Sequence, residues 1–202
     1  QKMNASFKAD ITVTFSNYKT GMFFEDGREC CGDIKVVDIG ISKKAYSKVT
    51  EKLFVCDEKF FEGSKDVALQ PRREKSCKGT YGTVGIIIGE GGMMGASILA
   101  SRAAYRTGCG LVKMFCPSQF TGFMNVSVPE AITVPYTKEG LISELDKFLE
   151  LVDVVVIGPG LSEDSRSMRM LRYILGKEIN VVLDAGALNL ISKDIRPFKE
   201  RK

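Results

Sequence analysis

Three glycine-bearing segments contain the residues of this chain whose types and spacing could do chemistry. They are GEGGMMGA from residue 89, GPGL from residue 158 and DAGAL from residue 184, and each follows a run of apolar residues typical of a strand. Glycine permits positive φ and lets the backbone approach a ligand closely. A helix that follows such a loop presents free N–H groups and its positive dipole end to an anion. The loops could therefore hold a phosphate-bearing ligand, or they could only make tight turns.

The first loop departs from two common nucleotide-binding motifs. Gly89, Gly91 and Gly95 form G-x-G-x-x-x-G, which is one residue longer than the dinucleotide fingerprint. The next apolar run, LVKMFCP, ends without the acidic residue that would bind a ribose hydroxyl, and no G-K-[ST] completes a Walker A loop. The carboxyl ends of parallel strands collect ligands at one sheet edge, so three converging loops favour a ligand site over three unrelated turns.

Strands and helices alternate along the second part of the chain, which predicts an α/β fold with a largely parallel sheet and right-handed crossovers. The expected strands are GTVGIIIG, LVKMFCP, DVVVIGPG and INVVLDAGAL, and the expected helices are GASILASRAAYRTG, GLISELDKFLELV and DSRSMRMLRYILG. Helical spacing indicates the inward faces of two of these helices. The residues expected on them are Ala96, Leu99, Ala100 and Ala103 in the first helix, and Leu141, Leu145, Phe148, Leu149 and Val152 in the second.

The first part of the chain contains too few elements for a core of its own. Ile11, Val13 and Phe15 alternate with threonines, which predicts a half-buried strand. EDGREC is expected to form a turn, DIKVVDIGIS a second strand, and residues 57–62 a helical segment. A domain boundary is expected within residues 45–56.

Composition excludes several classes of function. The chain has no histidine, which removes Ser-His-Asp and Cys-His catalysis and histidine-based zinc sites within it. Its net charge is +4, and its basic residues do not form the stripe that is typical of nucleic-acid-binding proteins, so no nucleic-acid partner is expected. The sequence contains no run of about 18 apolar residues, so no membrane span is expected. Six cysteines without a C-x-x-C pair indicate reduced thiols and a cytoplasmic protein.

Taken in order, the three motifs resemble one family. KGTYGTVGIIIGEGGMMGASILASRAAYRTGCGLVKMF, DVVVIGPGL and VVLDAGALNLI are similar to the signatures of the ADP- or ATP-dependent NAD(P)H-hydrate dehydratases, a ribokinase-like family. The resemblance covers residues 66–192. ADITVTFSNYKTGMFFEDGRECCGDIKVVDIGIS resembles the end of the Rossmann-like NAD(P)H-hydrate epimerase domain, which precedes the dehydratase domain in bifunctional repair proteins. We therefore expect the end of an epimerase-like domain in residues 1–47 and the first part of a dehydratase domain in residues 48–202.

The resemblance implies a repair function and a set of binding residues. The family removes water from hydrated NADH or NADPH with ADP or ATP, and the epimerase domain interconverts the two hydrate epimers. Gly95 and Ala96 match the family's G-M-x-G-A loop, and Gly158 and Gly160 match its G-P-G loop. Asp184 is either a polar group facing the ligand or a cap for the following turn.

The family's catalytic motif, G-[ST]-G-D-x-L-A-G, is expected beyond Lys202, so no catalytic residue and no metal ligand is expected in this chain. Residues 1–202 alone are accordingly expected to be inactive. The resemblance further implies Mg²⁺ with the nucleotide, K⁺ for the epimerase with its ligands outside this chain, and a homo-oligomer. Three motif positions depart from the family: Cys77 replaces a histidine, Ser162 a glycine and Gly186 an aspartate.

Two other functions stay open on the sequence alone. A ribokinase-like kinase of a vitamin precursor would share the fold but transfer a phosphoryl group to an alcohol. A split or decayed subunit could bind nucleotide without turnover, and the three departures support it to some extent. The epimerase-like first segment and the K-G-x-Y-G entry to the first strand favour the dehydratase.

Overall fold

The computed structural model describes residues 6–49, 53–56, 58, 60–63, 71–89 and 92–199. The chain divides into two compact units, residues 1–64 and 65–202. This division lies later in the chain than the expected change of domain between residues 47 and 48. Residues 60–63 are helical, whereas positions 57 and 59 of the expected helical segment lie outside the description. Within the described ranges, no helix has the length and apolar content needed to cross a bilayer.

The second unit contains a parallel sheet, as the sequence predicts, but the sheet has five strands where four were expected. Its order is β5-β4-β3-β6-β7, and every neighbouring pair is parallel. The strands are β3 (Thr83–Ile87), β4 (Leu111–Pro117), β5 (Ile132–Tyr136), β6 (Val154–Ile157) and β7 (Asn180–Leu183). The chain passes from β3 to β4 and β5 on one side, then returns to β6 and β7 on the other. The carboxyl ends of β3 and β6 thus lie at a topological switch point, where open α/β sheets bind ligands.

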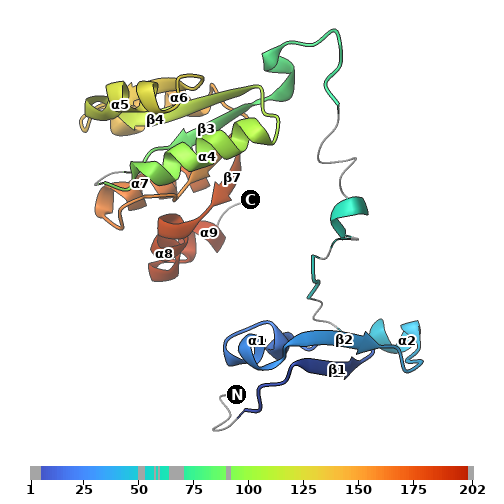
Figure 1. Ribbon diagram of the computed structural model, residues 1–202. Helices are drawn as coiled ribbons and strands as arrows, with labels where there is room; N and C mark the ends of the chain where they lie inside the picture. Colours follow the sequence, from blue (N-terminus) through green and yellow to red (C-terminus); the bar gives the residue numbers. More distant parts are fainter. Residues whose placement is uncertain are drawn as a thin grey trace. The chain divides into compact units, whose positions relative to one another are not determined.

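Helices cover both faces of this sheet. They are η2 (Lys78–Tyr81), α4 (Met94–Arg106), η3 (Ser118–Phe120), α5 (Thr121–Ser127), α6 (Leu141–Leu149), α7 (Ser165–Leu175), α8 (Ala185–Lys193) and α9 (Arg196–Lys199). Successive strand residues point to opposite faces, so Ile86 and Ile88 join the core under α4 and α5. Ile87 joins the core under α6, α7 and α8. Figure 1 shows α4 lying along β3 and β4.

The predicted inward face of α6 is confirmed, but that of α4 is wrong in part: Ala100 packs against the core, whereas Leu99 and Ala103 are exposed. Leu141, Leu145, Phe148 and Leu149 are buried, and Val152 packs against the same core. In α4 the fully buried residues are Ser97 and Ser101, whereas Leu99 is 69% exposed. The physical reason is that both hydroxyls find hydrogen-bond partners inside, which removes the cost of burying them. Small serines also let the helix approach the sheet closely.

The sequence analysis did not predict β5. This strand contains Pro135 and lies at one edge of the sheet. Proline has no N–H to donate, so an edge is the place in a sheet that tolerates it. Proline weakens the strand signal in the sequence, although the strand pairs regularly with β4.

The first unit contains the short parallel pair β1 (Ile11–Phe15) and β2 (Asp33–Val37), with η1 (Thr20–Met22), α1 (Asp26–Cys30) and α2 (Lys43–Tyr46). EDGREC was expected to be a turn, yet residues 26–30 form the one-turn helix α1, with acidic side chains in its first turn that suit the helix dipole. The residues of β1 alternate as predicted, but the exposed face is the apolar one. Ile11, Val13 and Phe15 are 60%, 55% and 57% exposed, while Thr14 is buried. Two strands do not make a stable domain, and the assignment of this unit to an epimerase domain stays a prediction.

Candidate functional site

The first two glycine loops pack backbone against backbone. A Cβ atom built on Gly89 would lie 2.1 Å from the carbonyl oxygen of Gly160, and one built on Gly160 would lie 2.3 Å from the carbonyl oxygen of Met93. Both distances are far shorter than a van der Waals contact, and Gly160 also has a φ of +70°. Only glycine allows the loops after β3 and β6 to approach this closely.

The second and third loops meet in the same way. A Cβ atom on Gly158 would lie 1.8 Å from the carbonyl oxygen of Asp184, and one on Gly186 would lie 2.4 Å from the carbonyl oxygen of Leu161. The three predicted loops therefore form one continuous surface at the carboxyl edge of the sheet. We call residues 89, 92–96, 158–161 and 184–187 the glycine ledge. Glu90 and Gly91 lie outside the described residues.

Gly95 differs from the ledge glycines that pack against backbone and from Gly92, whose φ of +86° itself favours glycine. It is exposed, it lies in the first turn of α4, and a Cβ atom built on it would meet no described atom within 4 Å. Glycine inside a helix costs roughly 0.5–1 kcal/mol relative to alanine. Packing within the described chain does not require this glycine, so it leaves open space above the helix. Ala96, the next residue, is half-buried.

Of the three helices that follow the ledge loops, α4, α7 and α8, two lack a side-chain cap. Met93 precedes α4 and Asp184 precedes α8, and neither side chain accepts a hydrogen bond from its helix. By contrast, Asp164 caps α7 by accepting a hydrogen bond from the Ser167 N–H at 2.8 Å. Uncapped first-turn N–H groups and the helix dipole favour an anion at these two positions.

Asp184 lies where β7 ends and is exposed. Its N–H donates to the carbonyl oxygen of Ile157 at 3.2 Å, and its carbonyl oxygen accepts from Ala187 N–H at 2.9 Å. Because its carboxylate makes no capping bond, the capping alternative from the sequence is wrong. The next residue, Ala185, has a φ of +37°, a conformation that costs a non-glycine residue about 1–2 kcal/mol. Such backbone strain concentrates at functional sites.

The three departures from the family pattern lie at different edges. Cys77 precedes η2, which leads into the amino end of β3, opposite the ledge. Its thiol lies 3.6 Å from the Thr80 hydroxyl, and this hydrogen bond lowers the pKa of Cys77. Ser162 follows the ledge directly and is half-buried. Gly186 belongs to the ledge itself, where its missing side chain allows the contact with Leu161.

Two hollows open at the amino edge of the sheet, away from the ledge. One, of about 690 Å³, is lined by Asp146, Leu149, Glu150, Val152, Asp153, Lys177, Glu178, Ile179 and Asn180. Its acidic lining is partly neutralised, because Asp146 accepts hydrogen bonds from Lys177 Nζ at 2.5 Å and from the Tyr173 hydroxyl at 2.7 Å. The hydrogen bond to Asp146 raises the pKa of Lys177 to about 12. These groups tie α6 to α7.

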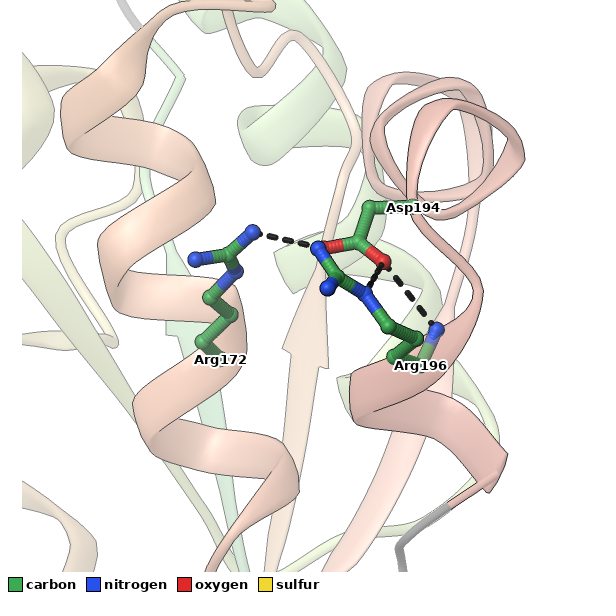
Figure 2. A network of polar contacts seen from close by, with 3 residues as sticks. All are labelled: Arg172, Asp194 and Arg196. Carbon is green, nitrogen blue, oxygen red and sulfur yellow. Dashed lines mark hydrogen bonds and ion pairs between the residues drawn. The ribbon is translucent and has the colours of Figure 1, made fainter.

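The second hollow, of about 500 Å³, contains a network of one carboxylate and two guanidinium groups. Figure 2 shows Asp194 between Arg172 of α7 and Arg196 of α9. Asp194 accepts from Arg196 Nε at 2.8 Å and from Arg172 Nη2 at 2.6 Å. Hydrogen bonds from Arg196, and then from Arg172, lower the pKa of Asp194. This network holds the end of α8 against α7.

The residues of the ledge do not form a metal site by themselves. Within the described ranges, no three His, Cys, Asp or Glu side chains are grouped so that they could hold a metal ion. Asp184 is the one carboxylate among the described ledge residues. Nearby Glu163 is occupied by Asn189 and Lys193, and Asp164 caps α7. Among the described residues of the ledge, the Mg²⁺ that the resemblance implies therefore finds no complete set of protein ligands.

Solved structures similar to this chain share its α/β fold. A ribokinase-like superfamily protein from Enterococcus faecalis has a TM-score of 0.55 and 27% identity, covering 63% of this chain and 45% of its own. An ADP/ATP-dependent NAD(P)H-hydrate dehydratase from Bacillus subtilis, co-crystallized with ATP/Mg²⁺, has a TM-score of 0.54 and 31% identity over the same shares. Both support the ribokinase-like part of the predicted fold.

Similar sequences include bifunctional NAD(P)H-hydrate repair enzymes. That of Moorella thermoacetica is 36% identical over 94% of this chain, and that of Escherichia coli is 31% identical over 96%. The chain spans 36% of the length of each of these relatives. The model of the NAD(P)H-hydrate dehydratase family matches residues 84–202, which is more than half of the chain and includes the whole glycine ledge. This chain therefore belongs to the NAD(P)H-hydrate dehydratase family.

Proposed function

We propose that the glycine ledge binds NADH hydrate or NADPH hydrate, and that the protein removes water from it to restore the reduced dinucleotide. One observation carries this proposal. Gly95 has open space above it at the uncapped start of α4, whereas packing requires glycine at Gly89, Gly158, Gly160 and Gly186, and a φ of +86° favours it at Gly92. The space and the free N–H groups together suit a bulky ligand that carries phosphates.

The ledge residues divide into three roles. Gly95 and Ala96 leave room for the ligand and place the first turn of α4 beside it. Gly158 and Gly160 set the shape of the surface, because their loops could not meet if they carried side chains. Asp184 offers an exposed carboxylate that can accept hydrogen bonds from ribose or nicotinamide groups of the ligand.

The energy source and the chemical step are proposed to depend on residues outside this chain. The similar Bacillus protein is described as ADP/ATP-dependent and was crystallized with ATP/Mg²⁺. We propose that the catalytic residues of this protein lie outside residues 1–202, and that the nucleotide and its Mg²⁺ bind there. Residues 1–202 alone would then not convert the hydrate. The ledge would then fix the hydrate while the other part of the domain performs the dehydration.

The first unit is proposed to be the end of an epimerase domain that interconverts the two hydrate epimers. Its exposed apolar strand face and its two-strand sheet suit the edge of a larger domain. The potassium ligands of that activity would lie outside this chain. We further propose that the protein is a cytoplasmic homo-oligomer without nucleic-acid or membrane partners.

The proposal is tested with a substitution that fills the open space. Gly95→Val places two methyl groups above α4, and we expect the Kd for NADH hydrate to rise at least about tenfold because the ligand must clash or move. Isothermal titration of the protein at its native length measures this. Gly122→Val is the matched control: Gly122 is also exposed, is also the second residue of its helix, and also has no described atom within 4 Å of its Cβ position.

Other outcomes would support the two alternatives. Phosphorylation of a thiazole or pyrimidine alcohol, with no action on the hydrate, would favour a small-molecule kinase. Hydrate binding without turnover in a native protein of 22.2 kDa would favour a non-catalytic binding subunit.

A further inference from the structure

Ser97 is a polar residue that lies wholly buried beneath the glycine ledge. Its exposed fraction is 0%. Its hydroxyl accepts a hydrogen bond from the Gly89 N–H at 3.2 Å and donates one to the carbonyl oxygen of Pro159 at 3.4 Å. One side chain thereby joins the loop after β3 to the loop after β6.

The position of Ser97 adds a third element to this link. Ser97 belongs to α4, one turn after its start, so its backbone is continuous with Gly95 and Ala96. A displacement of the hydroxyl would therefore shift the two loops relative to the helix that carries the open space. Without the hydroxyl, the buried N–H of Gly89 would lose its partner, which costs more than the net value of an ordinary hydrogen bond.

We propose that Ser97 is a positioning residue for NADH hydrate and NADPH hydrate binding. It does not touch the ligand, because it is fully buried. It holds the Gly89 and Pro159 loops at the spacing against α4 that the hydrate requires. This inference rests on the function proposed above, because it concerns the ligand of the same ledge.

Ser101 provides a matched control within the same helix. Its exposed fraction is also 0%, and its hydroxyl donates to the carbonyl oxygen of Ser97 at 2.8 Å. That bond stays inside α4 and reaches neither loop. Ser97→Ala and Ser101→Ala therefore each remove one buried hydroxyl from α4, but only the first removes the link between the loops.

The experiment compares both variants in the protein at its native length. Amide hydrogen exchange reports the protection of the Gly89 N–H, and titration with NADH hydrate reports the Kd. We expect both variants to lower the Tm, and Ser97→Ala to lower it more, because it leaves the buried Gly89 N–H without a partner. Only Ser97→Ala should increase exchange at Gly89, and only it should raise the Kd, by about tenfold. Ser97→Cys keeps a weak donor of similar size, and its Kd should lie between those of the wild type and Ser97→Ala.

Several outcomes would overturn the inference. They are an unchanged Kd for Ser97→Ala, an equal rise in Kd for both variants, and unchanged exchange at Gly89. If Ser97→Ala does not fold, Ser97→Cys replaces it in the test. A Ser97→Cys variant with the wild-type Kd and the wild-type exchange at the Gly89 N–H would also overturn the inference. Should the wild type itself not bind NADH hydrate, the proposed function fails, and the exchange of Gly89 alone decides whether Ser97 locks the loops.

Discussion

The carbonyl oxygen of Asp184 occupies the place that a side chain on Gly158 would need. An ideal Cβ atom on Gly158 would lie 1.8 Å from that oxygen. The contact joins the end of β6 to the end of β7, and it places the exposed Asp184 carboxylate on the same surface as the G-P-G loop. Gly158, for which the motif resemblance implies ligand binding, thus has a packing role that does not depend on any ligand.

Gly158→Ala should lower the free energy of unfolding much more than an ordinary glycine substitution does. The new methyl group meets backbone, and φ at this position is +129°, so overpacking and strain add to about 3 kcal/mol or more. Urea denaturation measures the change. Gly108→Ala is the control, because Gly108 has a φ of +97° but no described atom within 4 Å of its Cβ position. Gly108→Ala should lower the free energy of unfolding only by the cost of the strained backbone, about 1–2 kcal/mol.

Ala185→Gly should stabilise the protein by about 0.5–1 kcal/mol, because glycine removes the strain of a positive φ but adds chain entropy to the unfolded state. Ala103→Gly is the comparison, since Ala103 is exposed within the regular helix α4. It should destabilise by about 1 kcal/mol. Thermal unfolding of the two variants decides the matter, and a loss of stability in Ala185→Gly would show that Ala185 carries no strain.

The network of Asp194, Arg172 and Arg196 should make stability depend on pH in the acid range. The arginine hydrogen bonds lower the pKa of Asp194 in the folded protein, whereas an unfolded aspartate has a pKa of about 3.9. The folded state therefore binds this proton less readily. Its contribution to stability is present above about pH 4 and is lost as the pH falls through the folded pKa.

Asp194→Asn removes this titration. We expect the variant to have a lower Tm than the wild type at pH 7, and the difference to shrink as the pH falls well below 4. Tm values measured by circular dichroism across this range test the prediction. An identical acid dependence in the variant and the wild type would mean that Asp194 does not contribute to it.

The predictable part of the structure came from strong local patterns. The apolar runs around Ile86, Val112, Val155 and Val182 predict strands, and the strands form one parallel sheet. The spacing of Leu141, Leu145 and Phe148 predicts the buried face of α6 correctly. Such patterns are reliable because they depend on burial that repeats along one segment. The order of the three glycine motifs is enough to indicate the family without the tertiary structure.

Contacts between distant parts of the chain decided the rest. Ser97 is buried and Leu99 exposed because the hydroxyl of Ser97 forms hydrogen bonds with Gly89 and Pro159. The spacing of apolar residues in α4 does not predict these partners. Gly95 and Gly158 are the same residue type in neighbouring motifs. The tertiary structure separates them, since Gly158 meets the backbone of Asp184 and Gly95 meets open space. Sequence alone therefore determined which segments form the candidate site, and only the packing of loops remote in the chain decided which of its glycines meet backbone and which meet open space.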